Sequence, residues 1–168
     1  MMKRFLGARP HNERGFTTVW VLGLAIIIMV LGLAVFDVWS VYTRQRALTA
    51  HADSAAAAAA QAIDLSAYQS TPSRLALLTG DATSLAEARL RADFPGHSVS
   101  VSSIEVGRTC TGTPSDGQLI ACVSVDNTTN PNKPTVTVTV RQKANFTVFK
   151  LVGYADQTVS ASGTAGPR

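Results

Sequence analysis

The feature that most constrains this chain is a long uncharged run near its amino end. Residues 16–36 contain no charged side chain, and residues 19–36 contain no hydroxyl or amide side chain either. As a helix, this run would extend about 32 Å at 1.5 Å per residue, which is enough to cross the hydrocarbon core of a bilayer. The run therefore predicts a membrane-spanning helix, to which the remainder of the chain is attached.

The residues that flank the run predict where the membrane boundaries lie. Trp20 stands near one end and Trp39 follows the other, as expected for rings that sit at the membrane–water interface. Asp37 lies at the outer boundary, where an ionisable group is either functional or simply solvated at a helix end, and we favour solvation. These markers predict a membrane span over residues 16–39.

The distribution of charge predicts the direction of the span. Residues 1–36 hold four basic side chains and one acidic one, whereas residues 37–168 hold eleven basic and ten acidic ones. The positive-inside rule therefore predicts that residues 1–15 are a basic cytoplasmic leader and that everything beyond the span lies outside the cytoplasmic membrane. Because the outer part is close to neutral, a nucleic-acid-binding surface, which needs clustered Lys and Arg, is not expected.

A cleaved secretory signal is the alternative to a permanent anchor. The triplet Ala-His-Ala at residues 50–52 has the small-residue pattern of a signal-peptidase site. However, the apolar run is longer than the core of a signal peptide, and the charged residues Asp37, Arg44 and Arg46 stand before the triplet. We therefore expect that signal peptidase leaves the anchor intact.

The two cysteines, Cys110 and Cys122, both fall in the part expected outside the membrane. Residues 111–117 between them are rich in turn formers, so two strands joined by this loop would bring the cysteines opposite each other. An oxidising exterior would let them form a disulfide, whereas a metal site lacks further ligands at suitable spacing. We expect the disulfide, with two unpaired thiols as the alternative.

The segment after the span predicts a continuation of the same helix. Residues 37–68 contain no Gly or Pro and are rich in Ala, Leu, Arg and Gln, which are good helix formers. We expect one continuous helix over residues 17–65, and residues 40–68 form its alanine-rich extension beyond the span. A narrow apolar stripe of this extension consists of Leu48, Ala52, Ala55, Ala59 and Ile63. The stripe predicts close contact with this chain's own sheet or with a neighbouring helix, or else no interface at all.

Residues 69–168 predict a small α+β domain outside the membrane. The capping-box spacing at Ser84 predicts a short helix to about Asp93, and residues 145–154 fit a short apolar helix or a turn that closes with Gly153. Alternation of Val and Thr with polar residues predicts three to four antiparallel strands, at residues 98–106, 118–125, 134–143 and 157–165. The expected fold is therefore a long N-terminal helix followed by a small antiparallel sheet, in a pilin-like layout.

The sequence contains no recognisable arrangement of residues for catalysis. His11, His51 and His97 have no carboxylate or cysteine at ligand spacing, so we expect solvated side chains. The nucleophile-elbow, Walker A and dinucleotide-binding patterns do not occur. We expect no catalytic residue, no cofactor and no metal ligand, and therefore a structural rather than an enzymatic role.

Two parts of the sequence resemble the TadE/TadG-like proteins of the Flp (tight-adherence) pilus system, a branch of type IV pilus machinery. The first has ERG at residues 13–15, an apolar helix that ends in Asp37, and RQRALTAHADSAAAAAAQAID at residues 44–64. The second, looser one is the closing NFTVFKLVGYADQTVSASGTA at residues 145–165. The resemblance implies a membrane-anchored minor pilin-like or accessory protein. Its partners would be pilins and other pilus or secretion-system membrane proteins, contacted through the span and the alanine-rich helix.

The resemblance also implies a candidate processing site. In type IV prepilins a peptidase cuts after a glycine, so Gly15 and Phe16 form the candidate prepilin-peptidase junction. The fifth residue of the processed chain would then be Trp20, where prepilins usually carry a glutamate that compensates a neighbour's positive charge. Because tryptophan cannot do this, we expect the junction to stay uncleaved.

One other class of function also fits these features. A single-pass membrane protein could carry an extracellular domain that binds a ligand or the cell wall and has no connection with pili. The anchor, its direction and the outer domain would be the same in both cases, and only the partners would differ.

Overall fold

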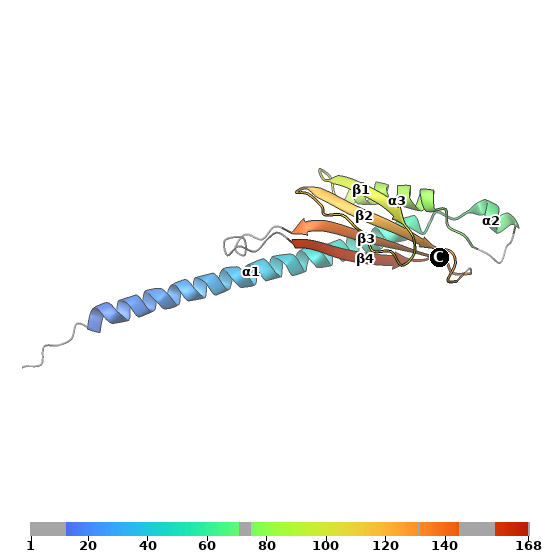
Figure 1. The fold of residues 1–168 in the computed structure, drawn as a ribbon. Coiled ribbons are helices and arrows are strands. Elements are labelled where there is room, and N and C mark those ends of the chain that lie inside the picture. Colours follow the sequence, from blue (N-terminus) through green and yellow to red (C-terminus); the bar gives the residue numbers. More distant parts are fainter. Residues whose placement is uncertain (1–12, 71–74, 131, 145–156, 168) are drawn as a thin grey trace, which may run out of the picture.

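The computed structural model describes residues 13–70, 75–130, 132–144 and 157–167, and its longest element is the helix α1 (Glu13–Ala59). The amino-terminal half of α1 projects away from the molecule, while its other half lies against a sheet (Figure 1). The predicted continuation of the apolar run into the alanine-rich segment is therefore confirmed. Good helix formers beyond residue 37, with no Gly or Pro over residues 37–68, account for a helix that continues past the apolar run.

Four strands form one sheet in the order β1-β2-β3-β4. Their bounds are β1 (Ser98–Ile104), β2 (Gln118–Asp126), β3 (Thr135–Ala144) and β4 (Gln157–Ala165). β2 and β3 pair antiparallel, as do β3 and β4, but β1 and β2 pair in parallel. The α+β class is confirmed, and the purely antiparallel sheet is corrected to a mixed one. A loop rich in turn formers suggests a hairpin, but residues 105–117 are also long enough for the crossover of about a dozen residues that a parallel pair needs.

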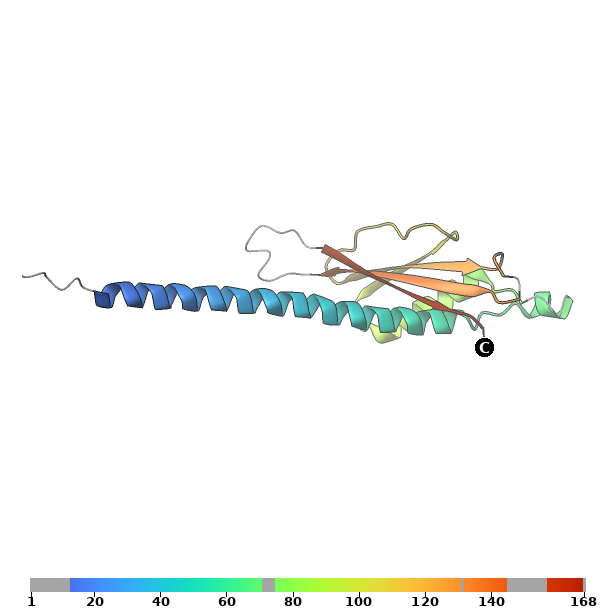
Figure 2. The same cartoon turned by 90° about the horizontal axis from the view of Figure 1, so that it is seen from below.

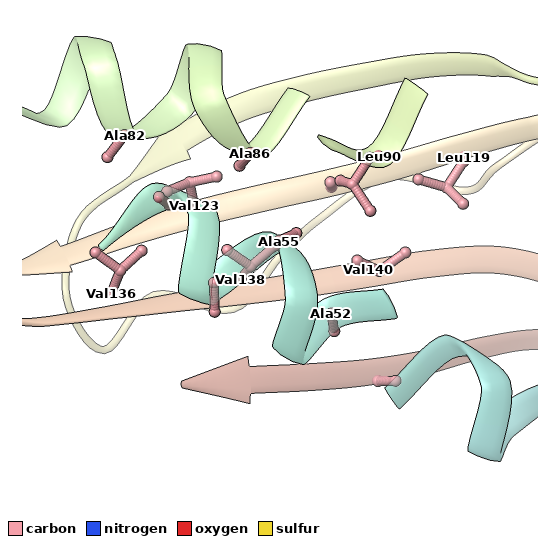
Figure 3. Close-up of a cluster of buried hydrophobic side chains, with 14 of the residues drawn as sticks. Ala52, Ala55, Ala82, Ala86, Leu90, Leu119, Val123, Val136, Val138 and Val140 are labelled. Carbon is pink, nitrogen blue, oxygen red and sulfur yellow. The ribbon is translucent and has the colours of Figure 1, made fainter. Parts of the chain in front are cut away.

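Two helices cover one face of this sheet (Figure 2). The helix α3 (Thr79–Asp93) packs on β1 and β2, and the outer half of α1 packs on β3 and β4. The central strands send alternate side chains into this layer, and six of them are fully buried: Leu119, Ala121, Val123, Val136, Val138 and Val140. Figure 3 labels the leucine and the valines of this set beside alanines from the two helices. The core is therefore a single helix–sheet layer.

The end of α1 differs from the prediction. The helix ends at Ala59 rather than near residue 65, because the N–H groups of Gln61 and Ala62 bond to carbonyls only three residues back. Ile63 then forms a β-bridge with Leu77, which turns the chain out of the helical path. A separate short helix, α2 (Leu65–Ser70), follows.

The helix α3 begins at Thr79, earlier than the predicted start at Ser84. Its buried residues Ala82, Ala86 and Leu90 are spaced by four, so contact with the core extends the helix by more than a turn. The Ser84 hydroxyl donates to the carbonyl of Asp81 inside the helix instead of capping it. The short helix or turn predicted for residues 145–154 lies outside the described residues.

Candidate functional site: the apolar helix and its junction with the outer domain

The amino-terminal half of α1 exposes almost every large side chain it carries. Between Val19 and Phe36 the large apolar side chains are 42 to 69% exposed. An apolar surface of this extent is not expected on a soluble monomer and indicates contact with lipid or with other proteins. The helix is also long and apolar enough to cross a membrane.

Two tryptophans lie at the ends of this surface. Trp20 and Trp39 are both 65% exposed, and Trp39 follows Trp20 by 19 residues of helix, which is about 28 Å along the axis. That spacing fits the roughly 30 Å hydrocarbon core of a bilayer. Tyr42 lies next to Trp39, with ring centroids 6.3 Å apart. The candidate junction of Gly15 and Phe16 falls in the first turn of α1.

Asp37 is the exception on this surface. Its neighbours Phe36 and Val38 are 68% and 60% exposed, whereas Asp37 is 6% exposed. Eleven residues are about three helical turns, so Asp37 lies on the same side of α1 as Leu48, which faces the domain. The favoured interpretation of a solvated carboxylate is therefore wrong, because this side chain is almost fully buried.

The alanine-rich half of α1 forms a close junction with the sheet. Ala52, Ala55 and Ala59 are fully buried against it, so the stripe packs on this chain's own sheet. Gly163 of β4 makes the closest approach, because a Cβ there would lie 2.4 Å from the backbone nitrogen of Asp53. Glycine inside a strand is a signal for such an approach, and it could have located this contact from the sequence.

The opposite face of the sheet carries the disulfide. Cys110 and Cys122 are bonded as predicted, with Cα atoms 5.6 Å apart. The bond does not join the two strands of a hairpin, because Cys110 lies on the crossover between the parallel strands β1 and β2. The Arg141 guanidinium also donates to the carbonyl of Cys110, at 2.9 Å. Together these contacts fix the crossover to β2 and β3.

A polar cluster joins α1 to α3 beside the core. Asp93 Oδ2 accepts a hydrogen bond from the Ser54 hydroxyl at 3.0 Å and lies 3.1 Å from Nδ1 of His51. The ring of Phe94 packs on the His51 imidazole, with centroids 4.6 Å apart. His51 is therefore paired, and the expectation that it is simply solvated is wrong. The sequence could not show this, because His51 and Asp93 are 42 residues apart.

The hydrogen bonds of this cluster hold α1 against α3 and are not arranged as a nucleophilic site. A nucleophilic triad needs a serine that gives its proton to histidine, which is in turn held by the carboxylate. Here Ser54 donates to Asp93 and to the His51 carbonyl, and not to the imidazole. Burial of Asp93 acts to raise its pKa, but the hydrogen bonds from His51 and Ser54 and the charge of Arg89 outweigh it and hold the pKa below its usual value.

A second polar contact holds the end of the segment between Ile63 and Leu77, which contains α2, against the rest of the domain. The Asn127 side chain accepts from the Leu77 N–H at 3.0 Å and donates to the Leu77 carbonyl at 2.9 Å, as a paired strand would. The Asp64 carboxylate accepts from the N–H groups of Ser66 and Ala67 at the start of α2. Its hydrogen bonds, led by the one from the Ser66 hydroxyl, lower the pKa of Asp64.

Among the residues that the structure describes, no group of three or more metal-ligating side chains occurs.

These features define a class of protein in which one apolar helix, able to span a membrane, continues into a small α+β domain. Residues 15–62 match the family model Tad, described as putative Flp pilus-assembly TadE/G-like. The resemblance expected from the sequence is thereby confirmed over the part of the chain that forms α1 and its end. Searches of curated proteins and of solved structures gave no match.

Proposed function

We propose that this chain is a membrane-anchored, structural component of Flp pilus assembly, of the minor pilin-like or accessory kind. The observation that carries the proposal is the position of the family match. Residues 15–62 comprise both the exposed apolar half of α1 and the alanine-rich half on which the outer domain is built. Such a subunit can pack its apolar helix against other membrane proteins while it holds a small domain at a fixed place outside.

The proposed placement puts residues 1–15 in the cytoplasm, residues 16–39 across the cytoplasmic membrane and the rest outside it. The basic leader supports this direction through the positive-inside rule. The Cys110–Cys122 disulfide supports it independently, because such bonds persist in oxidising compartments. The outer part then consists of the alanine-rich extension, residues 40–68, and a small domain, residues 69–168.

The partner surface is proposed to lie mainly on the apolar half of α1. The buried side of the alanine-rich half is occupied by this chain's own sheet, so it is not available to pilins or other pilus or secretion-system membrane proteins. The large exposed side chains before residue 37 do not take part in this contact with the sheet. This narrows the surface expected from the sequence, which included the alanine-rich stripe.

We also propose that the Gly15–Phe16 junction stays uncleaved, because Trp20 stands where a processed pilin would carry its charge-compensating glutamate. Mass spectrometry of protein purified from membranes tests this point. The expected mass includes residues 1–15, and a chain that begins at N-methylated Phe16 would contradict the proposal.

Deletion of the gene and complementation test the function itself. The deletion strain should lose Flp pili, and the wild-type gene should restore them. A variant with Ile27→Arg places a charge in the middle of the apolar run and should fail to restore pili, because an arginine at the centre of a span disfavours insertion. Unchanged piliation in the deletion strain would refute the proposal and favour a ligand- or cell-wall-binding role.

A further inference from the structure

We propose that one flank of α1 forms a binding site for one anionic phospholipid of the outer leaflet, with the phosphate held by Arg46. The inference rests on the proposed membrane placement and on nothing about pili. It is carried by two adjoining clefts, by the pairing of the arginines and by the depth of these residues relative to Trp39.

The lower cleft is apolar and fits an acyl chain. It has a volume of about 540 Å³ and lies along residues 31–42 of α1, at the outer boundary. Its described lining residues are Leu31, Ala34, Val35, Val38, Trp39 and Tyr42. All six lie at helical spacings of three or four along one flank of α1, so the cleft runs parallel to the helix and to the direction of lipid tails.

The upper cleft is polar and continues the lower one. It has a volume of about 280 Å³, is lined by Tyr42, Gln45, Arg46 and Thr49, and shares Tyr42 with the apolar cleft. A site that is apolar below and carries a guanidinium above matches the order of tail and phosphate in a phospholipid. Arginine is well suited to the role, because its planar fork binds a phosphate through two parallel hydrogen bonds.

The pairing of the arginines points to a partner outside the chain. Away from the membrane boundary, each arginine whose side chain the structure describes has a partner within the protein: Arg89 with Asp93, Arg91 with Glu87, Arg108 with Glu105, and Arg141 with the Cys110 carbonyl. Arg44 and Arg46 are exposed and form no hydrogen bond or ion pair with the described residues. Of these two, Arg46 lines the upper cleft and is thus left to bind an external anion there.

The depth of Arg46 agrees with this assignment. Arg46 follows Trp39 by seven residues, or about 10 Å along the axis, and the polar layer of one leaflet begins at the tryptophan level. Side chains of a helix tilt toward its amino end, which here points into the membrane. A long arginine side chain therefore reaches down to the phosphate level while its stem stays against the helix.

Native mass spectrometry of the full chain, purified in mild detergent and exchanged into phosphatidylglycerol or phosphatidylcholine, tests the proposal. Wild-type protein should retain one phosphatidylglycerol in preference to phosphatidylcholine. Arg46→Gln should lower this retention about fivefold, as expected for one arginine near an anionic lipid surface, and Arg44→Gln by less. Arg91→Gln removes the same charge far from the boundary and should change nothing.

A second variant separates the acyl-chain cleft from the charge. Ala34→Trp fills the apolar cleft and should abolish retention although both arginines remain. The proposal is overturned by equal retention of the two lipids, by an Arg46→Gln variant that behaves like wild type, or by a second copy of the chain found in place of the lipid. Alkaline extraction of membranes, done first, shows separately whether the anchor itself is wrong, and no result depends on pili.

Discussion

The two halves of α1 share one continuous backbone but have opposite surfaces. Before residue 37 the helix carries large side chains such as Ile27 and Met29, which are 57% and 68% exposed. Beyond Leu48 the side that faces the domain carries alanines that are fully buried. A large exposed apolar surface suits contact with lipid or with other proteins, whereas a sheet at van der Waals distance leaves space only for a methyl group.

This difference shows which part of the helix can serve neighbours. The alanine-rich half is already committed to the sheet, so a change there should act on folding. The apolar half should act on insertion and on partners while leaving the domain intact. Substitutions in the two halves of α1 and in the sheet test whether these roles are separate. The largest loss of unfolding free energy is expected at the closest contact between helix and sheet.

Gly163→Ala should have that largest effect. The added Cβ would lie 2.4 Å from the Asp53 nitrogen and 2.5 Å from the Ala52 carbonyl carbon, so the backbones of β4 and α1 must move apart. We expect the free energy of unfolding of the outer domain to fall by more than about 3 kcal/mol, at or beyond the upper range for overpacked sites. Denaturant titration in detergent, followed by circular dichroism, measures this loss.

The matched control is Gly80→Ala. Gly80 lies in the first turns of α3, and an added Cβ there would meet nothing within 4 Å, so the substitution should be neutral or stabilise the domain by up to about 1 kcal/mol. Equal losses from the two alanine substitutions would show that the junction at Gly163 is looser than the distances indicate.

Removal of the disulfide should rank next. Replacing both Cys110 and Cys122 by serine opens a loop with a sequence separation of 12 and should cost about 3 kcal/mol of unfolding free energy. Because the bond lies on the sheet face away from α1, membrane extraction should remain as in wild type. A variant that leaves the membrane fraction would mean that the domain and the anchor are not independent in the way proposed.

Ala55→Leu tests the alanine side directly. Ala55 is fully buried, so the larger side chain must push the helix from the sheet, and we expect a loss of about 2 kcal/mol in denaturant titration. Ala50→Leu is the control on the same helix, since Ala50 is exposed and should change the unfolding free energy by less than about 0.5 kcal/mol. Ile27→Ala, in the apolar half, should leave the unfolding free energy of the domain unchanged. A loss comparable to that of Ala55→Leu would show that the two halves of α1 do not have separate roles.

Much of this architecture could be predicted from local patterns. The uncharged run and the absence of breakers after it indicated one long helix, and alternation of Val and Thr located all four strands to within about two residues. These signals are local, because periodicity in a strand or helix reflects which face is buried. The sequence also supported the disulfide, since both cysteines fall in the outer part beside a turn-rich loop.

What the patterns could not supply was pairing between distant segments. The parallel β1–β2 pair and the contact between His51 and Asp93 each depend on elements that are far apart in sequence. The residues 105–117 are compatible with either a hairpin or a crossover, and only the register with β2 decides between them. Gly163 did carry a local signal, because an isolated glycine in a strand marks a close approach.

The smallest effect is expected at the cluster that links α1 to α3. Asp93 has a pKa held below its usual value, so it contributes stability that is complete above the ordinary pKa of 3.8 and is lost as the pH falls below that value. Asp93→Asn should lower the unfolding free energy at pH 7 by about 1 kcal/mol or less, as is typical of exposed and partly exposed ion pairs. The wild-type advantage over this variant should shrink as the pH falls below 4. Denaturant titrations of both proteins between pH 7 and 2.5 measure the difference, and a constant difference across that range would show that the carboxylate does not stabilise the junction through its charge.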